Sequence, residues 1–126
     1  MDDDPDDHFL FNETVSIIYP KVHITEFYFC TDMFKTLRKL SKEQLPELIF
    51  LDLNMPGNDG GQCLTELKTD SHLKHIPVII YSTSSVFFKQ EMLNKGAFKY
   101  IVKPPNIEAL EQIIKETFFE IESNLN

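Results

Sequence analysis

Long hydrophobic runs are absent from this sequence of 126 residues. A membrane-spanning helix needs about 20 consecutive apolar residues, and no stretch of the chain approaches that length. The first residues are acidic rather than rich in lysine and arginine, so they lack the composition of a secretory signal peptide. We therefore expect no membrane segment, and we expect the protein in the cytoplasm.

Basic residues are also scarce, because 12 lysines and arginines stand against 20 aspartates and glutamates, for a net charge of -8. Direct binding to nucleic acid needs a cationic surface that displaces counterions from phosphates, and this composition argues against it. The acidic excess is concentrated at the start of the chain, at Asp2, Asp3, Asp4, Asp6 and Asp7.

Only two cysteines are present, Cys30 and Cys63, and they show neither a CxxC spacing nor a histidine partner pattern. We expect them to be buried free thiols in a reducing compartment. The sequence also lacks internal repeats and low-complexity linkers. With 42% hydrophobic and 25% charged residues, it is expected to form a single domain over residues 1–126, with no output domain.

Segments with the patterns of strands and helices alternate along the chain. Strands are predicted at 24–29, 48–51, 77–81 and 98–102. Helices are predicted before Pro20, between Thr31 or Asp32 as the cap and Pro46, over 63–70, between Ser85 and the stop at Gly96, and after the cap Asn106. This alternation implies an α/β fold with a parallel sheet and helices on both of its faces.

The apolar run from Leu48 to Leu51 is interrupted by Asp52, directly before the turn residues Pro56 and Gly57. Asp52 is therefore placed at the carboxyl end of a buried strand, the edge where parallel sheets bind ligands. A carboxylate there can be a nucleophile, a metal ligand or a residue that caps the turn.

Two other predicted strands end in polar residues, Ser82 and Lys103. A carboxylate, a hydroxyl and an ammonium group at one edge are suited to handling a phosphoryl group, because Mg²⁺ and the lysine can neutralise the transferred charge. Asp2 and Asp3 would join this group if they followed a strand.

These motifs together resemble the receiver domain of two-component response regulators, and the chain is similar to the single-domain chemotaxis regulators. The matching segments are Asp2-Asp3, 51–57 with Asp59-Gly60, 77–82, Gly96-Ala97 and 100–104. The resemblance implies a flavodoxin-like, doubly wound parallel sheet with strand order 2-1-3-4-5.

The resemblance also assigns the chemistry. Asp52 would be the phosphoacceptor, taking a phosphoryl group from a sensor histidine kinase or a histidine phosphotransfer protein. Such a chain is a signalling phosphoacceptor rather than an enzyme acting on other substrates. Mg²⁺ would be held by Asp3, by Asp52 and by the backbone carbonyl of Asn54, with Asp2 acting through a water molecule.

Other residues would make the switch. Ser82 and Lys103 would bind the phosphoryl oxygens, and inward rotation of Tyr100 would follow. The family also implies a cis peptide bond between Lys103 and Pro104.

The signal would leave through a protein surface, which in the family is the face of the fourth helix, fifth strand and fifth helix. In this chain that face includes Phe87, Lys89, Lys95, Lys99, Tyr100 and parts of 107–118. Two other functions remain open. One is a receiver-like interaction module that is never phosphorylated. The other is a phosphohydrolase of the haloacid dehalogenase type, which carries a second Asp two residues after its nucleophile, where this chain has Asn54.

One element of the family is missing, because only Met1 precedes the acidic cluster, where the family has its central first strand. Strands lie about 4.8 Å apart, so its removal leaves a gap of about 9.6 Å and unpaired backbone groups on both sides. Three explanations are open: the sequence has lost residues at its start, another chain fills the gap through swapping or a homodimer, or the fold adapts locally.

Overall fold

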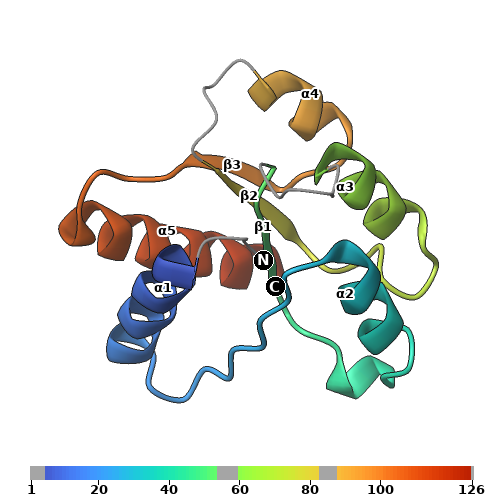
Figure 1. Ribbon diagram of the computed structural model, residues 1–126, viewed down its shortest axis with the longest axis horizontal. Coiled ribbons are helices and arrows are strands. Elements are labelled where there is room, and N and C mark those ends of the chain that lie inside the picture. Colours follow the sequence, from blue (N-terminus) through green and yellow to red (C-terminus); the bar gives the residue numbers. More distant parts are fainter. Residues whose placement is uncertain (1–4, 54–59, 83–87, 126) are drawn as a thin grey trace. The chain divides into compact units, whose positions relative to one another are not determined.

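A computed structural model describes residues 5–53, 60–82 and 88–125, with side chains described from Leu10 onwards except at the end of the chain (Figure 1). The chain forms two compact units. One spans Phe27–Val102, and the other combines the segment that ends at Glu26 with the segment that begins at Lys103.

The first unit is built on a parallel sheet of three strands in the order β1-β2-β3 among the described residues. The strands are β1 (Ile49–Leu51), β2 (Val78–Ser82) and β3 (Lys99–Val102). Their register pairs Leu51 with Ile80, and Ile80 with Tyr100. Leu51, Val78, Ile79 and Ile80 are wholly buried, as expected for a parallel sheet covered on both faces. The predictions of strands at 48–51, 77–81 and 98–102 are confirmed.

Helices α2 (Cys30–Leu37), α3 (Gly60–Thr69) and α4 (Lys89–Asn94) belong to the same unit, as does the short 3-10 helix η1 (Lys42–Gln44). The apolar positions of α2 recur at helical spacing, so one face of this helix is buried and the other is polar. The helices and strands share one core: Cys30, Met33, Phe34, Leu37, Ile49, Leu51, Cys63, Leu64, Leu67, Leu73, Ile76, Val78, Ile80, Met92, Ala97 and Tyr100.

Gly96 ends α4, as predicted. Its φ of 107° lies in the left-handed region, which favours glycine because a Cβ is strained there. The amides of Gly96 and Ala97 donate to the carbonyls of Leu93 and Met92, both at 3.1 Å, which is the Schellman pattern of helix termination.

The second unit pairs α1 (Pro5–Ile18) with α5 (Ile107–Leu125). The rings of Tyr19 and Phe118 stack with their centroids 4.7 Å apart. The Asn106 side chain accepts a hydrogen bond of 2.8 Å from the amide of Ala109, so the predicted cap is confirmed. None of the described helices combines the length and the apolar composition that a bilayer crossing requires.

The predicted strand at 24–29 is wrong, because this segment has no regular secondary structure. Its alternating pattern suits a strand, but a strand also needs a neighbour for its backbone hydrogen bonds, and the described sheet has only β1, β2 and β3. The cap predicted at Thr31 or Asp32 is also wrong, because α2 already begins at Cys30 without a side-chain cap.

Beyond α3, a polar cluster joins the end of α2 to the turn before β2. The Arg38 guanidinium contacts the Asp70 carboxylate at 3.0 Å, and the Asp70 carboxylate accepts a bond of 2.8 Å from the backbone amide of His72. The His72 ring lies 2.7 Å from the carbonyl of Leu40. The hydrogen bond from the amide of His72 is the largest effect and holds the pKa of Asp70 below its ordinary value of 3.8. Burial opposes this shift, and the guanidinium of Arg38 lowers the pKa further.

This shift makes stability depend on pH. A lowered pKa in the folded state stabilises the fold above pH 3.8, and the contribution disappears as the pH falls through the folded-state pKa. Because Arg38 is half exposed, we expect Asp70→Asn to lower the free energy of unfolding by only about 0.5–1 kcal/mol at neutral pH. Urea unfolding at several pH values checks this. A difference between variant and wild type that stays constant into acid contradicts it.

Candidate functional site

Asp52 is the residue that follows β1, and its side chain is only 3% exposed. An ionised carboxylate is costly to bury unless hydrogen bonds or a cation compensate its charge. No buried side-chain nitrogen or oxygen in the described part of the chain lacks a hydrogen-bond partner. The fold therefore buries the polar side chain of Asp52 without leaving its buried oxygen atoms unpaired.

Ser82 ends β2 and is fully buried. Since β1 and β2 are parallel, with Leu51 paired with Ile80, Asp52 and Ser82 both lie at the carboxyl edge of the sheet. This edge is the predicted position for both residues. A carboxylate and a hydroxyl are thus contributed by adjacent strands.

Tyr100 lies on β3 and is 8% exposed, within the core of the first unit. Burial raises the pKa of its phenol, and the negative charge of Asp52 raises it further. The two side chains are therefore electrostatically linked. Tyr100 faces inward in this structure, so it does not contribute the exposed surface that was predicted for it.

Gly60, the first residue of α3, lies directly against the backbone around Asp52. A Cβ at this position would stand 2.8 Å from the Cα of Leu53 and 3.1 Å from the carbonyl oxygen of Asp52. A side chain at this position would press on the backbone around Asp52, so glycine lets the helix begin this close to that residue. Sequence reasoning placed Gly60 in the matching motif without giving it this role, since a close approach between backbones leaves no local pattern.

Lys103 follows β3 directly, is half-buried and belongs to the second unit. The predicted cis bond between Lys103 and Pro104 is wrong, because no peptide bond of the described residues is cis. The trans form is the lower-energy state before proline, by about 0.5–1 kcal/mol.

The remaining metal ligands that were predicted, Asp2, Asp3 and Asn54, lie outside the described residues. Within those residues, no three His, Cys, Asp or Glu side chains gather into a group that could hold a metal ion.

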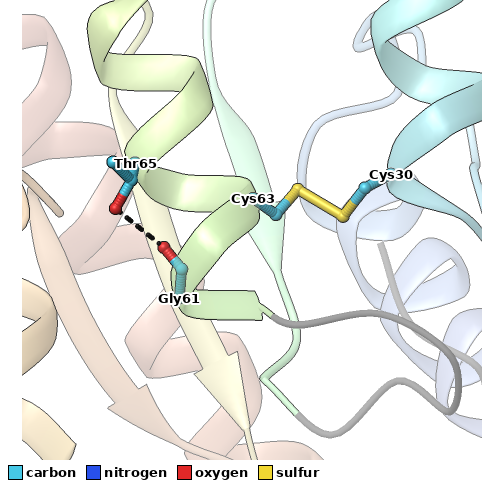
Figure 2. Close-up of a disulfide and its surroundings, with 4 residues drawn as sticks. All are labelled: Cys30, Gly61, Cys63 and Thr65. Carbon is cyan, nitrogen blue, oxygen red and sulfur yellow. Dashed lines mark hydrogen bonds between the residues drawn. A yellow bond between two sulfur atoms is a disulfide. The ribbon is translucent and has the colours of Figure 1, made fainter.

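The prediction of free thiols is wrong, because Cys30 and Cys63 form a disulfide (Figure 2). Their Cα atoms are 6.2 Å apart, within the range that a disulfide spans. The two residues are 33 positions apart in the chain and meet because α2 and α3 pack in one core. Spacing in the sequence carried no signal of this contact.

Comparison with known proteins identifies the family. The model of the response regulator receiver domain matches residues 2–115, and the chain belongs to this family. It is thus a receiver domain of two-component phosphorelay signalling, with the flavodoxin-like receiver fold that was predicted.

Curated relatives are similar over part of their length. Histidine kinase P4 of Formosa agariphila is 39% identical over 82 residues, which are 64% of this chain and 6% of the kinase. The polar-differentiation response regulator DivK of Brucella anthropi is 32% identical over 77 residues, 60% of this chain and 63% of DivK. The chain therefore spans less than two thirds of either relative.

Solved structures agree over most of the chain. The phosphorylated cyanobacterial phytochrome response regulator RcpA superposes with a TM-score of 0.81 at 30% identity, covering 93% of this chain and 86% of that one. The Mn²⁺-bound response regulator Rcp1 gives 0.70 at 25% identity, covering 92% and 86%.

Proposed function

We propose that this receiver domain accepts a phosphoryl group on Asp52 and that the modification changes its binding to other proteins. The observation that carries the proposal is the buried Asp52 carboxylate at the carboxyl end of β1, in a chain that belongs to the receiver family. The carboxylate attacks the phosphorus, the bond to the donor breaks, and an acyl phosphate remains on Asp52.

A divalent cation fits the donor chemistry of this position, because the buried Asp52 carboxylate offers hard oxygen ligands. We assign Mg²⁺ to Asp52, Asp3 and the backbone carbonyl of Asn54, with Asp2 acting through water. When bound, the ion supplies positive charge that offsets the charge of the phosphoryl group. Because the ligands must be ionised, its affinity should fall as the pH drops. Rcp1, bound to Mn²⁺, is a similar structure.

Phosphorylation would add about -1.5 to -2 charge at Asp52. We assign Ser82 and Lys103 to the phosphoryl oxygens and Tyr100 to the switch that follows.

The phosphodonor is proposed to be a sensor histidine kinase or a histidine phosphotransfer protein in the cytoplasm. The downstream partner is proposed to be a protein that binds α4, β3 and α5, rather than nucleic acid. A homodimer is one form that such an interaction can take.

Replacing Lys103 tests the switch. We expect Lys103→Ala to leave Mg²⁺ affinity within about twofold, because the lysine is not a metal ligand, and to remove the structural response to phosphorylation. Tyrosine fluorescence, followed while Mg²⁺ and then acetyl phosphate are added, measures both. Lys99→Ala, on β3 four residues earlier, is the matched control. A phosphorylation response in Lys103→Ala equal to that of wild type contradicts the assignment.

Turnover of p-nitrophenyl phosphate separates this proposal from a phosphohydrolase. A receiver domain should not hydrolyse p-nitrophenyl phosphate rapidly over many turnovers. Acetyl phosphate should instead transfer one phosphoryl group to each protein molecule. Rapid, sustained release of p-nitrophenol, abolished by Asp52→Asn, overturns the proposed function. The same labelling experiment tests the unphosphorylated interaction module, which would take up no phosphoryl group.

A further inference from the structure

The disulfide ties together the starts of two helices. Cys30 is the first residue of α2, and Cys63 lies in the first turn of α3. Figure 2 shows the bond passing between the two helices, with Thr65 on the other side of α3. The Thr65 hydroxyl donates a bond of 3.0 Å to the carbonyl of Gly61, which holds the first turn of α3 together as one piece.

The opposite ends of these helices are joined by other contacts. Arg38, at the end of α2, contacts Asp70 just after α3, and the His72 ring contacts the carbonyl of Leu40. The helices are therefore fastened at both ends by independent links. Opening the disulfide releases only their starts.

The released end is the one beside the phosphoacceptor. Gly60 precedes Cys63 by less than one helical turn and lies against Leu53 and the carbonyl of Asp52. The turn that carries Cys63 therefore sets one side of the space around Asp52. A small displacement at Cys63 moves Gly60 relative to the acceptor.

We infer that the Cys30–Cys63 pair is a redox site that controls phosphoryl uptake at Asp52: the disulfide holds the acceptor end of α2 and α3 in place, and its reduction loosens that end. This inference rests on the proposed function. Disulfides in cytoplasmic proteins are rare, and those that occur are usually transient, catalytic or redox-sensing. A disulfide in a domain proposed to act in the cytoplasm thus favours a redox role.

The reductant is a dithiol. One of its thiolates attacks the sulfur of Cys30, which is 9% exposed against 3% for Cys63. The bond between the two protein sulfurs breaks, and Cys63 leaves as a thiolate that takes a proton. The second thiol of the reductant then attacks the mixed disulfide and releases Cys30, so the protein gains two electrons and two protons while the reductant becomes a disulfide.

The test compares the oxidised chain with the chain reduced by dithiothreitol and then desalted. Alkylation followed by intact mass counts free thiols, and circular dichroism follows the fold. The measured quantity is the initial rate of labelling by acetyl phosphate with Mg²⁺. A misplacement of 1 Å can cost about 100-fold in rate, so partial loosening should slow labelling by about three- to tenfold. Reoxidation should restore the rate.

Two variants complete the test. The double variant Cys30→Ser, Cys63→Ser should label at the slow rate with or without dithiothreitol. Arg38→Gln, which breaks one of the two links at the far end and leaves the contact of His72 with Leu40, should keep the redox response. If the reduced wild type is labelled as fast as the oxidised chain or faster, the inference is overturned and the proposed function stands. If reduction instead removes the circular dichroism signal of the folded chain, the inference is also overturned, because the disulfide is then needed only for folding. Absence of label in both forms overturns the proposed function and the inference with it.

Discussion

Asp52→Asn is expected to abolish labelling by acetyl phosphate: the intact mass of the variant should stay unchanged under conditions in which the wild type should gain ~80 Da, the mass of one phosphoryl group. The amide has nearly the shape of the carboxylate but is a poor nucleophile, so the chemistry is lost while the fold remains. Removing a buried charge should leave the free energy of unfolding equal to that of the wild type or higher.

A second readout shows whether the site of the variant is intact. The charge of Asp52 helps to raise the pKa of Tyr100, so Asp52→Asn should lower that pKa toward its ordinary value of 10.0 without reaching it, because burial is the larger cause. An ultraviolet titration, with Tyr100→Phe to assign the signal, measures the shift. Labelling that persists in Asp52→Asn moves the acceptor to another residue.

Gly60→Ala is expected to destabilise the fold and slow phosphorylation together. The new Cβ would stand 2.8 Å from the Cα of Leu53, a backbone atom that cannot rotate away. Alanine favours helices over glycine by about 1 kcal/mol, but overpacking of this kind costs about 1–3 kcal/mol, so we expect a net loss of about 1 kcal/mol. Because the strain falls on the segment that carries Asp52, the labelling rate should fall as well.

The control is Glu66→Ala, an alanine substitution on the exposed face of the same helix, which should change stability by less than about 0.5 kcal/mol. Urea unfolding and the initial labelling rate are measured for both variants. Gly60→Ala that matches the wild type in stability and rate would show that α3 does not constrain the acceptor.

The strands of the sheet could be predicted because their signal is local. The apolar runs ending at Leu51 and Tyr81 each have the length and composition of a buried strand, and the polar residue after Leu51 marks its end. The stop at Gly96 and the cap at Asn106 are equally local, since each depends on the chemistry of one residue. Both are present in the structure.

The predictions that were wrong concerned features that depend on contacts between distant segments of the chain. The segment 24–29 has the alternation of a strand but no strand beside it among the described residues, so the pattern could not decide its structure. Cys30 and Cys63 lie 33 positions apart in the chain and form a disulfide, a contact that the local sequence could not reveal.

In the candidate site, too, the residues marked by a local pattern could be predicted, and those that depend on contacts between distant segments could not. Asp52 and Ser82 lie at the predicted edge because the ends of parallel strands coincide there. The role of Gly60 could not be read from its neighbours in sequence, because it depends on how closely α3 approaches Leu53. The assignments of Lys103 and Tyr100 remain predictions that the variants above test.

The central claim is best tested by the intact mass of the purified chain after incubation with acetyl phosphate and Mg²⁺, with and without EDTA. We expect a gain of ~80 Da on a single site with Mg²⁺ and no gain once EDTA has removed the ion. Location of the label at Asp52 by peptide mapping completes the result. Absence of any gain with Mg²⁺, or a gain that EDTA does not prevent, contradicts metal-dependent phosphorylation of this receiver domain.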